Sequence, residues 1–383
     1  HELVATYGDT VELDLLARRW VLRRRTGGTD AGWHLKRPSA DGARDELSHP
    51  AGRSATVVPA AVQREVAVFV RGKKLQPIAR LSSRRTVVSL RDAEGEAAAE
   101  VMIDDVDAVA FGADGAELGT SRWRELEVEL GSGDADLLLS VVKAVRAAGA
   151  TPSASPSKLD QALRPRLNGT HPEPPAVPHD LGPSHAVGVV LAYLAQEVMH
   201  LQEQDPRVRQ DAPDAVHQMR VASRRLRSAL ATYRELFDRE VTEPIRTELQ
   251  WLGVELGAAR DVEVVRDHLI GEVAAEPAAL RHGPVVKRIG SAMAARYKAA
   301  HVRGVAAMTS PRYYALLDAL DALVGRPPLA EDAAGKPVEA LTGLTRRTWR
   351  RIKRQHAELA ALAPSAVHER DLVLHEIRKS AKR

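Results

Sequence analysis

The chain has 383 residues, of which 28% are charged and 44% hydrophobic, and it contains no cysteine. This length suggests two or three domains that each bury a core, and the hydrophobic share excludes wholesale disorder. The absence of cysteine excludes disulfides, thiolate zinc sites and cysteine nucleophiles. The longest apolar run, from Ala186 to Ala195, is too short for the roughly 20 residues that a membrane span needs, so no membrane partner is expected.

The formal net charge of +4 is unevenly distributed along the chain. Residues 1–150 contain 21 Lys and Arg against 23 Asp and Glu, a net charge of −2. Subtraction from the totals of 55 and 51 leaves 34 basic and 28 acidic residues for 151–383, a net charge of +6. Near-neutrality of the whole argues against a polyanion partner, whereas the basic second half reopens that possibility.

Proline marks the boundary between the two halves. Eight prolines lie between Ala150 and Ser184, namely Pro152, Pro156, Pro165, Pro172, Pro174, Pro175, Pro178 and Pro183. Proline is excluded from helix interiors and central strands, so this stretch is predicted to be a semi-rigid extended linker. The expected organisation is a domain over residues 1–149, a linker over 150–183 and a second domain over 184–383.

The first half alternates apolar and polar residues as a β-sheet does. Helices are expected at about Pro59 to Val70 and Asp134 to Ala147, which gives an α+β domain rich in antiparallel strands. The predicted strands include Trp20 to Arg25, Trp33 to Lys36, Leu75 to Leu90, Glu100 to Ile103 and Arg124 to Leu130.

The second half has apolar residues at three- and four-residue spacing throughout, which predicts an all-helical bundle. Proline is tolerated in the first turn of a helix, and four prolines are predicted to lie at helix starts. The expected helices are His185 to Gln204, Pro213 to Asp238, Glu243 to Leu256, Asp261 to Val273 and further helices from Pro284, and the four prolines are Pro213, Pro244, Pro284 and Pro311.

One predicted helix carries a row of cations. At 100° per residue His217, Arg220, Arg224 and Arg227 share a face, beside an apolar face that includes Met219 and Leu226. The row extends about 15 Å, and its residues have no acidic partner at i±4 on the same helix. A linear polyanion would relieve the repulsion between these cations and release counterions. An ordinary solvated helix face remains the alternative.

The same pattern recurs at the end of the chain, in register and 158 residues later. His375 aligns with His217, Arg378 with Arg220 and Lys382 with Arg224, which indicates an internal repeat of two related basic helices. The chain ends just after this second copy begins, so its last helix is expected to be truncated. Neither histidine has a carboxylate or a second histidine at i+3 or i+4, which argues against a metal site here.

This half resembles the CHAD domain, the conserved-histidine α-helical domain, whose two halves each carry a His-x-x-Arg helix followed by Lys and Arg. The turn from Leu256 to Val264 is similar to the family's Leu-Gly-x-x-Arg-Asp-x-Asp-Val element, with Glu263 in place of the second Asp. The resemblance implies a pseudo-symmetric helical bundle that binds inorganic polyphosphate through a central basic groove. The ligand residues that it implies are His217, Arg220, Arg224, Arg227, His375, Arg378 and Lys382, together with Arg225, Lys379 and Arg383.

Charges also alternate on the predicted strands of the first half. Arg23 and Arg25 project from one face of their strand, and Glu125 and Glu127 from one face of theirs. In a barrel interior, such basic groups would hold phosphate oxygens and the carboxylates would hold Mg²⁺ or Mn²⁺. The alternative is an antiparallel sheet with one face in water.

Several of these elements resemble, in order, those of the CYTH domain, the triphosphate tunnel fold of class IV adenylyl cyclases, thiamine triphosphatases and inorganic triphosphatases. The resemblance implies a triphosphate held by Arg23, Arg25, Lys36 and Arg84 or Arg85, and a metal held by Glu125 and Glu127. The matching segments are Tyr7 to Thr10, Trp20 to Arg25, Trp33 to Lys36, Ile103 to Val106, Arg124 to Glu129 and Ser157 to Leu159.

One departure from the CYTH pattern bears on the metal. The family opens with a Glu-x-Glu-x-Lys strand that supplies metal ligands, and no such motif precedes Tyr7. Since the chain begins with His1 rather than Met, either a first strand lies upstream or the domain has lost its metal site. Phosphate loops and Gly-x-Ser-x-Gly elbows are absent.

The sequence therefore predicts a cytoplasmic protein, with polyphosphate granules as a candidate location. It is expected to have an antiparallel tunnel barrel followed by a helical bundle that binds inorganic polyphosphate. The tunnel domain is expected to bind or hydrolyse a triphosphate compound, with Mg²⁺ or Mn²⁺ as its metal. In an alternative reading the protein is primarily a metal-dependent inorganic triphosphatase. A nucleic-acid module is a weaker alternative, because aromatic residues are only 4% of the chain and no aromatic residue interleaves the arginines of the two rows.

Overall fold

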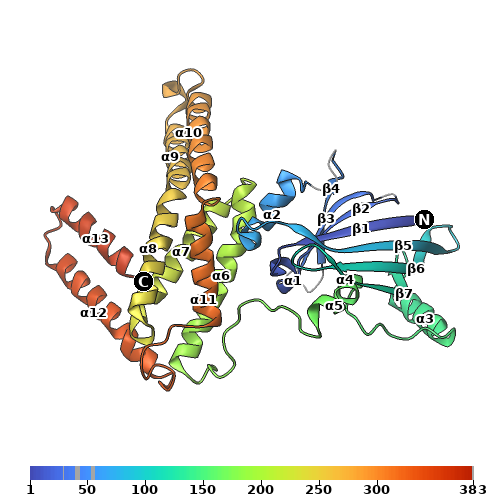
Figure 1. The fold of residues 1–383 in the computed structure, drawn as a ribbon. Helices are drawn as coiled ribbons and strands as arrows, with labels where there is room; N and C mark the ends of the chain where they lie inside the picture. Colours follow the sequence, from blue (N-terminus) through green and yellow to red (C-terminus); the bar gives the residue numbers. More distant parts are fainter. Residues whose placement is uncertain (29, 39–43, 53–56, 382–383) are drawn as a thin grey trace. The chain divides into compact units, whose positions relative to one another are not determined.

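The structure is a computed structural model that describes residues 1–383 apart from 29, 39–43, 53–56 and 382–383. It divides into two compact units, the N-terminal unit His1–Pro174 and the C-terminal unit Pro175–Arg383. The N-terminal unit combines a β-sheet with short helices, and the C-terminal unit is helical (Figure 1).

The N-terminal unit is built on one antiparallel sheet of seven strands in the order β4-β3-β2-β1-β5-β6-β7. Its side chains alternate between the two faces, as the period of two in the sequence requires. The strands are β1 (Glu2–Asp9), β2 (Val21–Thr26), β3 (Gly32–Pro38), β4 (Arg44–Pro50), β5 (Gln76–Arg91), β6 (Ala97–Phe111) and β7 (Glu117–Leu130). Strands β1 and β4 were not among the predicted runs, and β6 and β7 extend beyond them.

Short helices cover the hydrophobic parts of this sheet. Helices α1 (Asp14–Ala17) and α2 (Ala60–Val70) enclose one cluster that contains Leu15, Leu35 and Val66, all of them buried. Helix α3 (Ala135–Ala147) begins at Asp134, whose side chain caps it by accepting a hydrogen bond from the backbone N–H of Leu137. The two helices expected within this half are thus confirmed.

The sheet is not closed, because no pairing joins the edge strands β4 and β7 in the described residues. The fold class is confirmed in its main terms, with an antiparallel sheet in the first unit and helices throughout the second. The N-terminal unit resembles a strongly curved open sheet more than a complete barrel (Figure 1).

Part of the expected linker is folded. Residues 157–167 form α4 (Lys158–Ala162) and α5 (Arg164–Leu167), which pack on strands β5, β6 and β7. Leu159, Leu163 and Leu167 recur at four-residue spacing and are buried in the sheet's second hydrophobic cluster. Proline does not prevent this, because Pro165 lies in the first turn of α5, where its missing N–H is not needed.

The C-terminal unit is all-helical after a lead-in from Pro175 that has no regular secondary structure. Residues 150–157 and 168–174 of the predicted linker have none either. Helices α9 and α10 form a long antiparallel hairpin (Figure 1). The helices are α6 (Ala186–Arg209), α7 (Ala215–Thr232), α8 (Arg239–Glu255), α9 (Gly257–Ala275), α10 (Val285–Ala307), α11 (Pro311–Gly325), α12 (Ala340–Ala361) and α13 (Val367–Ala381), with 3₁₀ turns at Arg234–Leu236 and Ala278–Leu280.

Two proline predictions have different outcomes. Pro311 is the first residue of α11, after Ser310, whose hydroxyl accepts a hydrogen bond from the backbone N–H of Tyr313. Pro244 was expected to start a helix, but it lies inside α8, which begins earlier because Asp238 caps it. Among the described residues, no helix is both long enough and apolar enough to cross a membrane.

Candidate functional site

The N-terminal unit contains a cavity of about 1110 Å³ on one face of the sheet. It is lined by residues of all seven strands and by the residues around the start of α4. The charged side chains that line it are Arg23, Arg25, Asp30, Lys36, Glu46, Arg85, Glu100, Glu127, Glu129 and Lys158.

Four of the five residues predicted to hold a triphosphate line this cavity. Lys36 comes from β3, and Arg23 and Arg25 come from β2, where Arg24 between them does not line the cavity. On β5 the cavity residue is Arg85 and not Arg84. Since neighbours on a strand face opposite sides, Arg84 is exposed on the other face, opposite Asp105 of β6.

The cations of β2 and β3 are held by carboxylates of the same unit. Glu46 Oε2 lies 3.1 Å from Lys36 Nζ and Glu46 Oε1 lies 3.5 Å from Arg23 Nη2. The same Oε1 is 2.7 Å from Nδ1 of the buried His34. Burial alone would raise the pKa of Glu46, but Lys36, Arg23 and His34 together hold it below its ordinary value. Arg25 is paired in the same way with Asp30.

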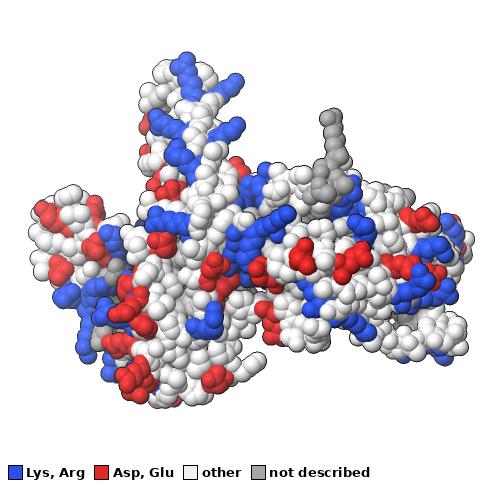
Figure 2. Space-filling model, in the orientation of Figure 1, with Lys and Arg blue, Asp and Glu red and all other residues white. Residues whose placement is uncertain are grey.

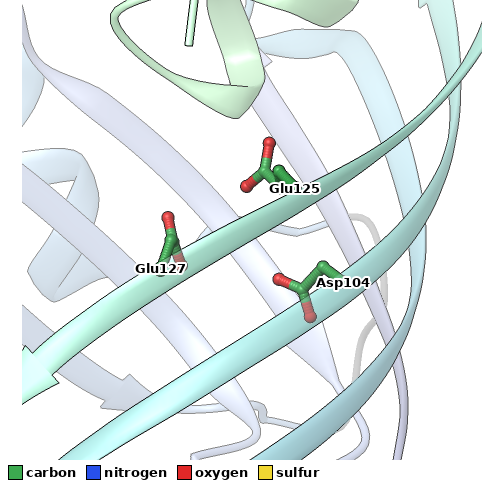
Figure 3. Close-up of side chains that lie close together, drawn as sticks. All are labelled: Asp104, Glu125 and Glu127. Atoms are coloured by element: carbon green, nitrogen blue, oxygen red, sulfur yellow. The ribbon is translucent and has the colours of Figure 1, made fainter. Parts of the chain in front are cut away.

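Three carboxylates converge beside the cavity, and one of them, Glu127, lines it. Asp104 of β6 lies opposite Glu125 of β7 in the strand register, and Glu127 is the next residue on that face. Their ligand oxygens all lie within 4.8 Å of one another (Figure 3). The two predicted metal ligands, Glu125 and Glu127, are therefore brought together, and the structure adds the fully buried Asp104.

Two cations satisfy this carboxylate cluster. Lys158 Nζ lies 3.0 Å from Asp104 Oδ2 and 2.9 Å from Glu127 Oε2, and it also contacts Glu125. Arg85 donates to both oxygens of Asp104, from Nε at 2.8 Å and from Nη2 at 2.6 Å. Three negative and two positive charges leave one negative charge in excess.

These contacts set the charge states of the cluster. Burial alone would raise the pKa of Asp104, but hydrogen bonds from Arg85 and Lys158 hold it below its ordinary value. Burial would likewise lower the pKa of Lys158, yet the carboxylates of Glu125 and Glu127 outweigh it and raise that pKa. Asp104 and Lys158 are therefore both charged near neutral pH.

The donor set of the cluster suits a hard divalent cation. Mg²⁺ and Mn²⁺ prefer oxygen ligands, and three carboxylates offer them without nitrogen or sulfur. The indole N–H of Trp123 donates to Glu125 Oε2 at 2.6 Å and fixes that carboxylate. A bound ion would share these oxygens with the ammonium group of Lys158.

The predicted cation row of the C-terminal unit lies on α7. The apolar face next to it is buried, with Met219, Ala222 and Leu226 at 0% exposure, as the periodicity predicted. His217 and Arg220 are half-buried and Arg224 is exposed. Among the described residues, His217 and Arg224 have neither a hydrogen bond nor an ion pair.

The other basic residues of α7 have tertiary partners that helical spacing does not reveal. Arg220 Nη1 lies 3.6 Å from Asp261 of α9. Arg225 Nη1 lies 3.1 Å from the buried Glu197 of α6, and Arg227 donates to Gln250 of α8 at 3.1 Å. All three partners lie on neighbouring helices. A cation of α7 can therefore be paired even though α7 itself offers no acidic residue at i±4.

The second predicted row lies on α13, which packs against α12, while α12 packs against α7. Of its predicted ligands, His375, Arg378 and Lys379 lie within the helix, and Lys379 Nζ is 2.7 Å from Glu376 Oε1. Lys382 and Arg383 lie outside the described residues. In the part of the chain that the structure describes, α12 thus contacts both of the helices that carry the two rows.

Helix α12 is a basic element that the analysis of single motifs missed. Arg346, Arg350 and Arg354 recur at four-residue spacing and are all exposed. Trp349, 56% exposed, lies among them with Lys353 Nζ 5.6 Å from its ring centroid. The run Arg-Arg-Thr-Trp-Arg-Arg-Ile-Lys-Arg was visible in the sequence, and it shows that aromatic residues do interleave arginines outside the two predicted rows.

Comparisons with known proteins place this geometry in a family. The CYTH domain profile matches residues 1–167 and the CHAD domain profile residues 192–383. Two uncharacterized proteins, from two strains of Mycobacterium tuberculosis, are each 38% identical over 397 residues, covering 100% of this chain and 74% of the relative.

Solved structures give weaker likenesses. PptA from Streptomyces chartreusis is 21% identical with a TM-score of 0.42, covering 51% of this chain and 72% of that one. A putative adenylate cyclase from Bacillus halodurans is 13% identical with a TM-score of 0.26, covering 42% and 81%. The two profiles and the relatives that match along the whole chain establish the family. The chain belongs to the family of proteins in which a CYTH domain is followed by a CHAD domain.

Proposed function

We propose that the C-terminal unit binds inorganic polyphosphate. The observation that carries this proposal is the row on α7, where His217 and Arg224 are without partners among the described residues while Arg220 and Arg227 extend the same face. Aligned cations raise one another's energy, and a chain of phosphates offers one negative charge after another along such a row. His375, Arg378, Lys379 and Lys382 are proposed as further ligands on the second row, with Arg225 beside the first.

Polyphosphate fits the row on α7 better than nucleic acid does. Recognition of single strands depends on aromatic side chains that stack with bases. The face of α7 that carries His217, Arg220 and Arg224 has no such side chain. The proposed site of action is the cytoplasm, at polyphosphate granules, which imaging of a fluorescent fusion would test.

The binding proposal is tested with the full chain and long-chain polyphosphate. The variant His217→Ala, Arg220→Ala, Arg224→Ala should lose about 100-fold or more in affinity, because three charge-assisted contacts are removed. The control Arg91→Ala, Arg122→Ala, Arg124→Ala removes three exposed cations of the N-terminal unit and should bind normally. Equal affinity for single-stranded DNA of matched charge would contradict the choice of polyphosphate.

A second function is favoured by the cavity of the N-terminal unit. Arg23, Arg25, Lys36 and Arg85 line the same cavity as Glu127, one member of the carboxylate cluster. The cations are placed to bind the oxygens of a triphosphate compound, and Asp104, Glu125 and Glu127 would hold Mg²⁺ or Mn²⁺. Such an ion, when bound, supplies charge neutralisation to the phosphate oxygens.

The proposed activity of the unit is triphosphate hydrolysis, and the charge balance of the cavity sets a condition on the substrate. Among the described residues, the lining of the cavity contains five Lys and Arg side chains and five carboxylates. These charges balance when no divalent cation is bound. A triphosphate must therefore displace carboxylates from Arg23, Lys36 and Arg85 or bring compensating charge with it.

The hydrolysis proposal is tested by phosphate release from tripolyphosphate with Mg²⁺ or Mn²⁺. Glu127→Gln should reduce the rate at least about 100-fold, the scale expected when transition-state charge loses its stabilisation. Glu117→Gln, on the same strand but outside the cavity, should leave the rate unchanged. Absence of release by the wild-type protein with either metal would leave triphosphate binding alone.

A further inference from the structure

Helix α10 has a charge distribution unlike that of the helix with which it pairs. The segment 277–317, which contains all of α10, has no Asp or Glu. Within α10 itself the cations are Lys287, Arg288, Arg296, Lys298 and Arg303. All five are exposed.

These cations lie on one side of the helix. The less exposed residues of α10, such as Met293, Ala300 and Gly304, recur at three- and four-residue spacing and mark its packing side. At 100° per residue, the five cations occupy about half of the circumference, away from that side. From Lys287 to Arg303 they extend about 24 Å. Lys and Arg side chains project along the hairpin in Figure 2.

On the partner helix α9, by comparison, carboxylates of the same helix compensate the charges of the arginines. Arg260 Nη1 lies 3.0 Å from Glu263, and Arg266 Nη2 lies 2.8 Å from Asp267, so its arginines are paired on their own helix. By contrast, none of the five cations of α10 has a hydrogen bond or an ion pair to any described residue. Their mutual repulsion is therefore left for an external anion to relieve.

The aromatic residue of α10 is not available to such a ligand. Tyr297 donates to Asp211 at 2.5 Å and stacks on His301, with the ring centroids 5.9 Å apart. His301 in turn contacts the backbone carbonyl of Val208 at 2.7 Å. The exposed side of α10 consequently offers charge without a stacking platform, which suits a polyanion that has no bases.

We propose that the outer side of α10 is a second binding surface for polyphosphate, which takes up the part of a long chain that extends beyond the α7 row. This inference depends on the proposed function of the C-terminal unit. Two modest surfaces on one chain-like ligand give an avidity that neither has alone, so the contribution of α10 should grow with the length of the polyphosphate.

The experiment uses the full chain with five cations of α10 replaced, in the variant Lys287→Gln, Arg288→Gln, Arg296→Gln, Lys298→Gln, Arg303→Gln. Glutamine keeps the helix propensity and removes the charge. Affinity for long-chain polyphosphate should fall at least about tenfold, with a shallower dependence on salt, because fewer counterions are released. Binding of tripolyphosphate should not change.

A matched control removes the same charge from the N-terminal unit, in the variant Arg91→Gln, Arg122→Gln, Arg124→Gln, Lys143→Gln, Arg146→Gln. It should bind long chains as the wild type does. If circular dichroism shows that the α10 variant with five substitutions folds poorly, two smaller variants test the two parts of the surface separately. These are Lys287→Gln/Lys298→Gln and Arg288→Gln/Arg296→Gln/Arg303→Gln. Each should reduce affinity for long chains by about threefold or more.

Several results would overturn the inference. An α10 variant with wild-type affinity and salt dependence would do so, as would one that loses affinity for single-stranded DNA alone. The α7 variant distinguishes the two proposals. If it loses polyphosphate binding while the α10 variant keeps it, only the inference on α10 fails; if the α7 variant also binds normally, the proposed function fails.

Discussion

The cations of the N-terminal cavity and those of helices α7 and α10 differ in what they contact. In the cavity, Arg25, Lys36, Arg85 and Lys158 each have a carboxylate partner. On α10 all five cations, and on α7 Arg224, are without partners among the described residues. A ligand of the cavity must exchange with carboxylates that are already in place, whereas a ligand of the helices only displaces water and counterions.

Under the proposed functions, this difference would give one chain two kinds of phosphate recognition. A cavity with a balanced internal network selects for a ligand that brings its own compensating charge, and its affinity depends on shape and metal. An uncompensated helical surface binds by charge and is sensitive to salt and to the length of the ligand. The following predictions test the contrast, beginning with the largest expected effect.

The largest effect is expected where the network is most buried. Asp104→Asn leaves Arg85 and Lys158 without their shared buried carboxylate, and it should lower the free energy of unfolding of the N-terminal unit by about 3 kcal/mol. The neighbouring Asp105→Asn removes the partner of the exposed Arg124 and should cause no measurable change. Chemical unfolding of both variants in the full chain measures this, and similar values for the two would show that the buried network adds no stability.

Two buried carboxylates of the same unit should respond to pH in opposite directions. The pKa of Asp104 is held below its ordinary value, so its stabilisation is present above about pH 4, the unfolded pKa, and is lost as the pH falls through its lower folded pKa. Burial raises the pKa of Asp9 to about 6, although the backbone N–H groups of Leu15, Leu16 and Thr10 oppose this. Its ionisation therefore costs stability progressively between about pH 4 and pH 6.

Substitution of each carboxylate separates the two effects. As the pH rises from 4 to 7, the stability of Asp9→Asn should improve relative to wild type by about 3 kcal/mol, the free-energy equivalent of a shift of about two pKa units. The disadvantage of Asp104→Asn should shrink below pH 4. Unfolding free energies measured at pH 3, 4, 6 and 7 provide the comparison, and parallel pH profiles for wild type and Asp9→Asn would contradict the assignment of Asp9.

The third prediction concerns competition within the carboxylate cluster. Lys158→Gln removes the ammonium group from among Asp104, Glu125 and Glu127, and the affinity of the cluster for Mn²⁺ should rise about tenfold because the local negative charge increases. Titration followed by the paramagnetic signal of free Mn²⁺ measures it directly. Lys143→Gln, on the exposed side of α3, is the matched control, and an unchanged Mn²⁺ affinity for both variants would rule out competition by Lys158.

Much of the cavity could be predicted from the sequence, because strand alternation is local. Arg23 and Arg25 are two residues apart and were expected on one face, and the structure places both in the cavity. Glu125 and Glu127 follow the same rule. Alternation also separates Arg84 from Arg85, but it does not reveal which of the two faces inward until the register with β1 and β6 is known.

The parts that sequence reasoning missed depend on contacts between distant segments. Lys158 reaches the cluster only because α4 folds back onto the sheet, within a stretch whose prolines predicted an extended linker. Glu197 and Asp261 pair with cations of α7 from other helices, and no periodicity within α7 indicates them. Local pattern thus predicts which face carries charge, while tertiary packing decides which charges are compensated.

The smallest effect is expected at Glu46, a carboxylate whose side chain is only partly buried and contacts two cavity cations. Glu46→Gln keeps an acceptor for His34 but removes the negative charge that holds Arg23 and Lys36, so both cations become free for phosphate oxygens. Tripolyphosphate should bind about fivefold more tightly in the absence of metal, which corresponds to about 1 kcal/mol, the size of one modest charged interaction. Asp45→Asn is the control, because Asp45 lies on the same strand, pairs with Arg37 and does not line the cavity. Equal affinities for wild type and Glu46→Gln would mean that Glu46 does not compete with the ligand. The cluster around Asp104 would then have to maintain the balance of charge in the cavity.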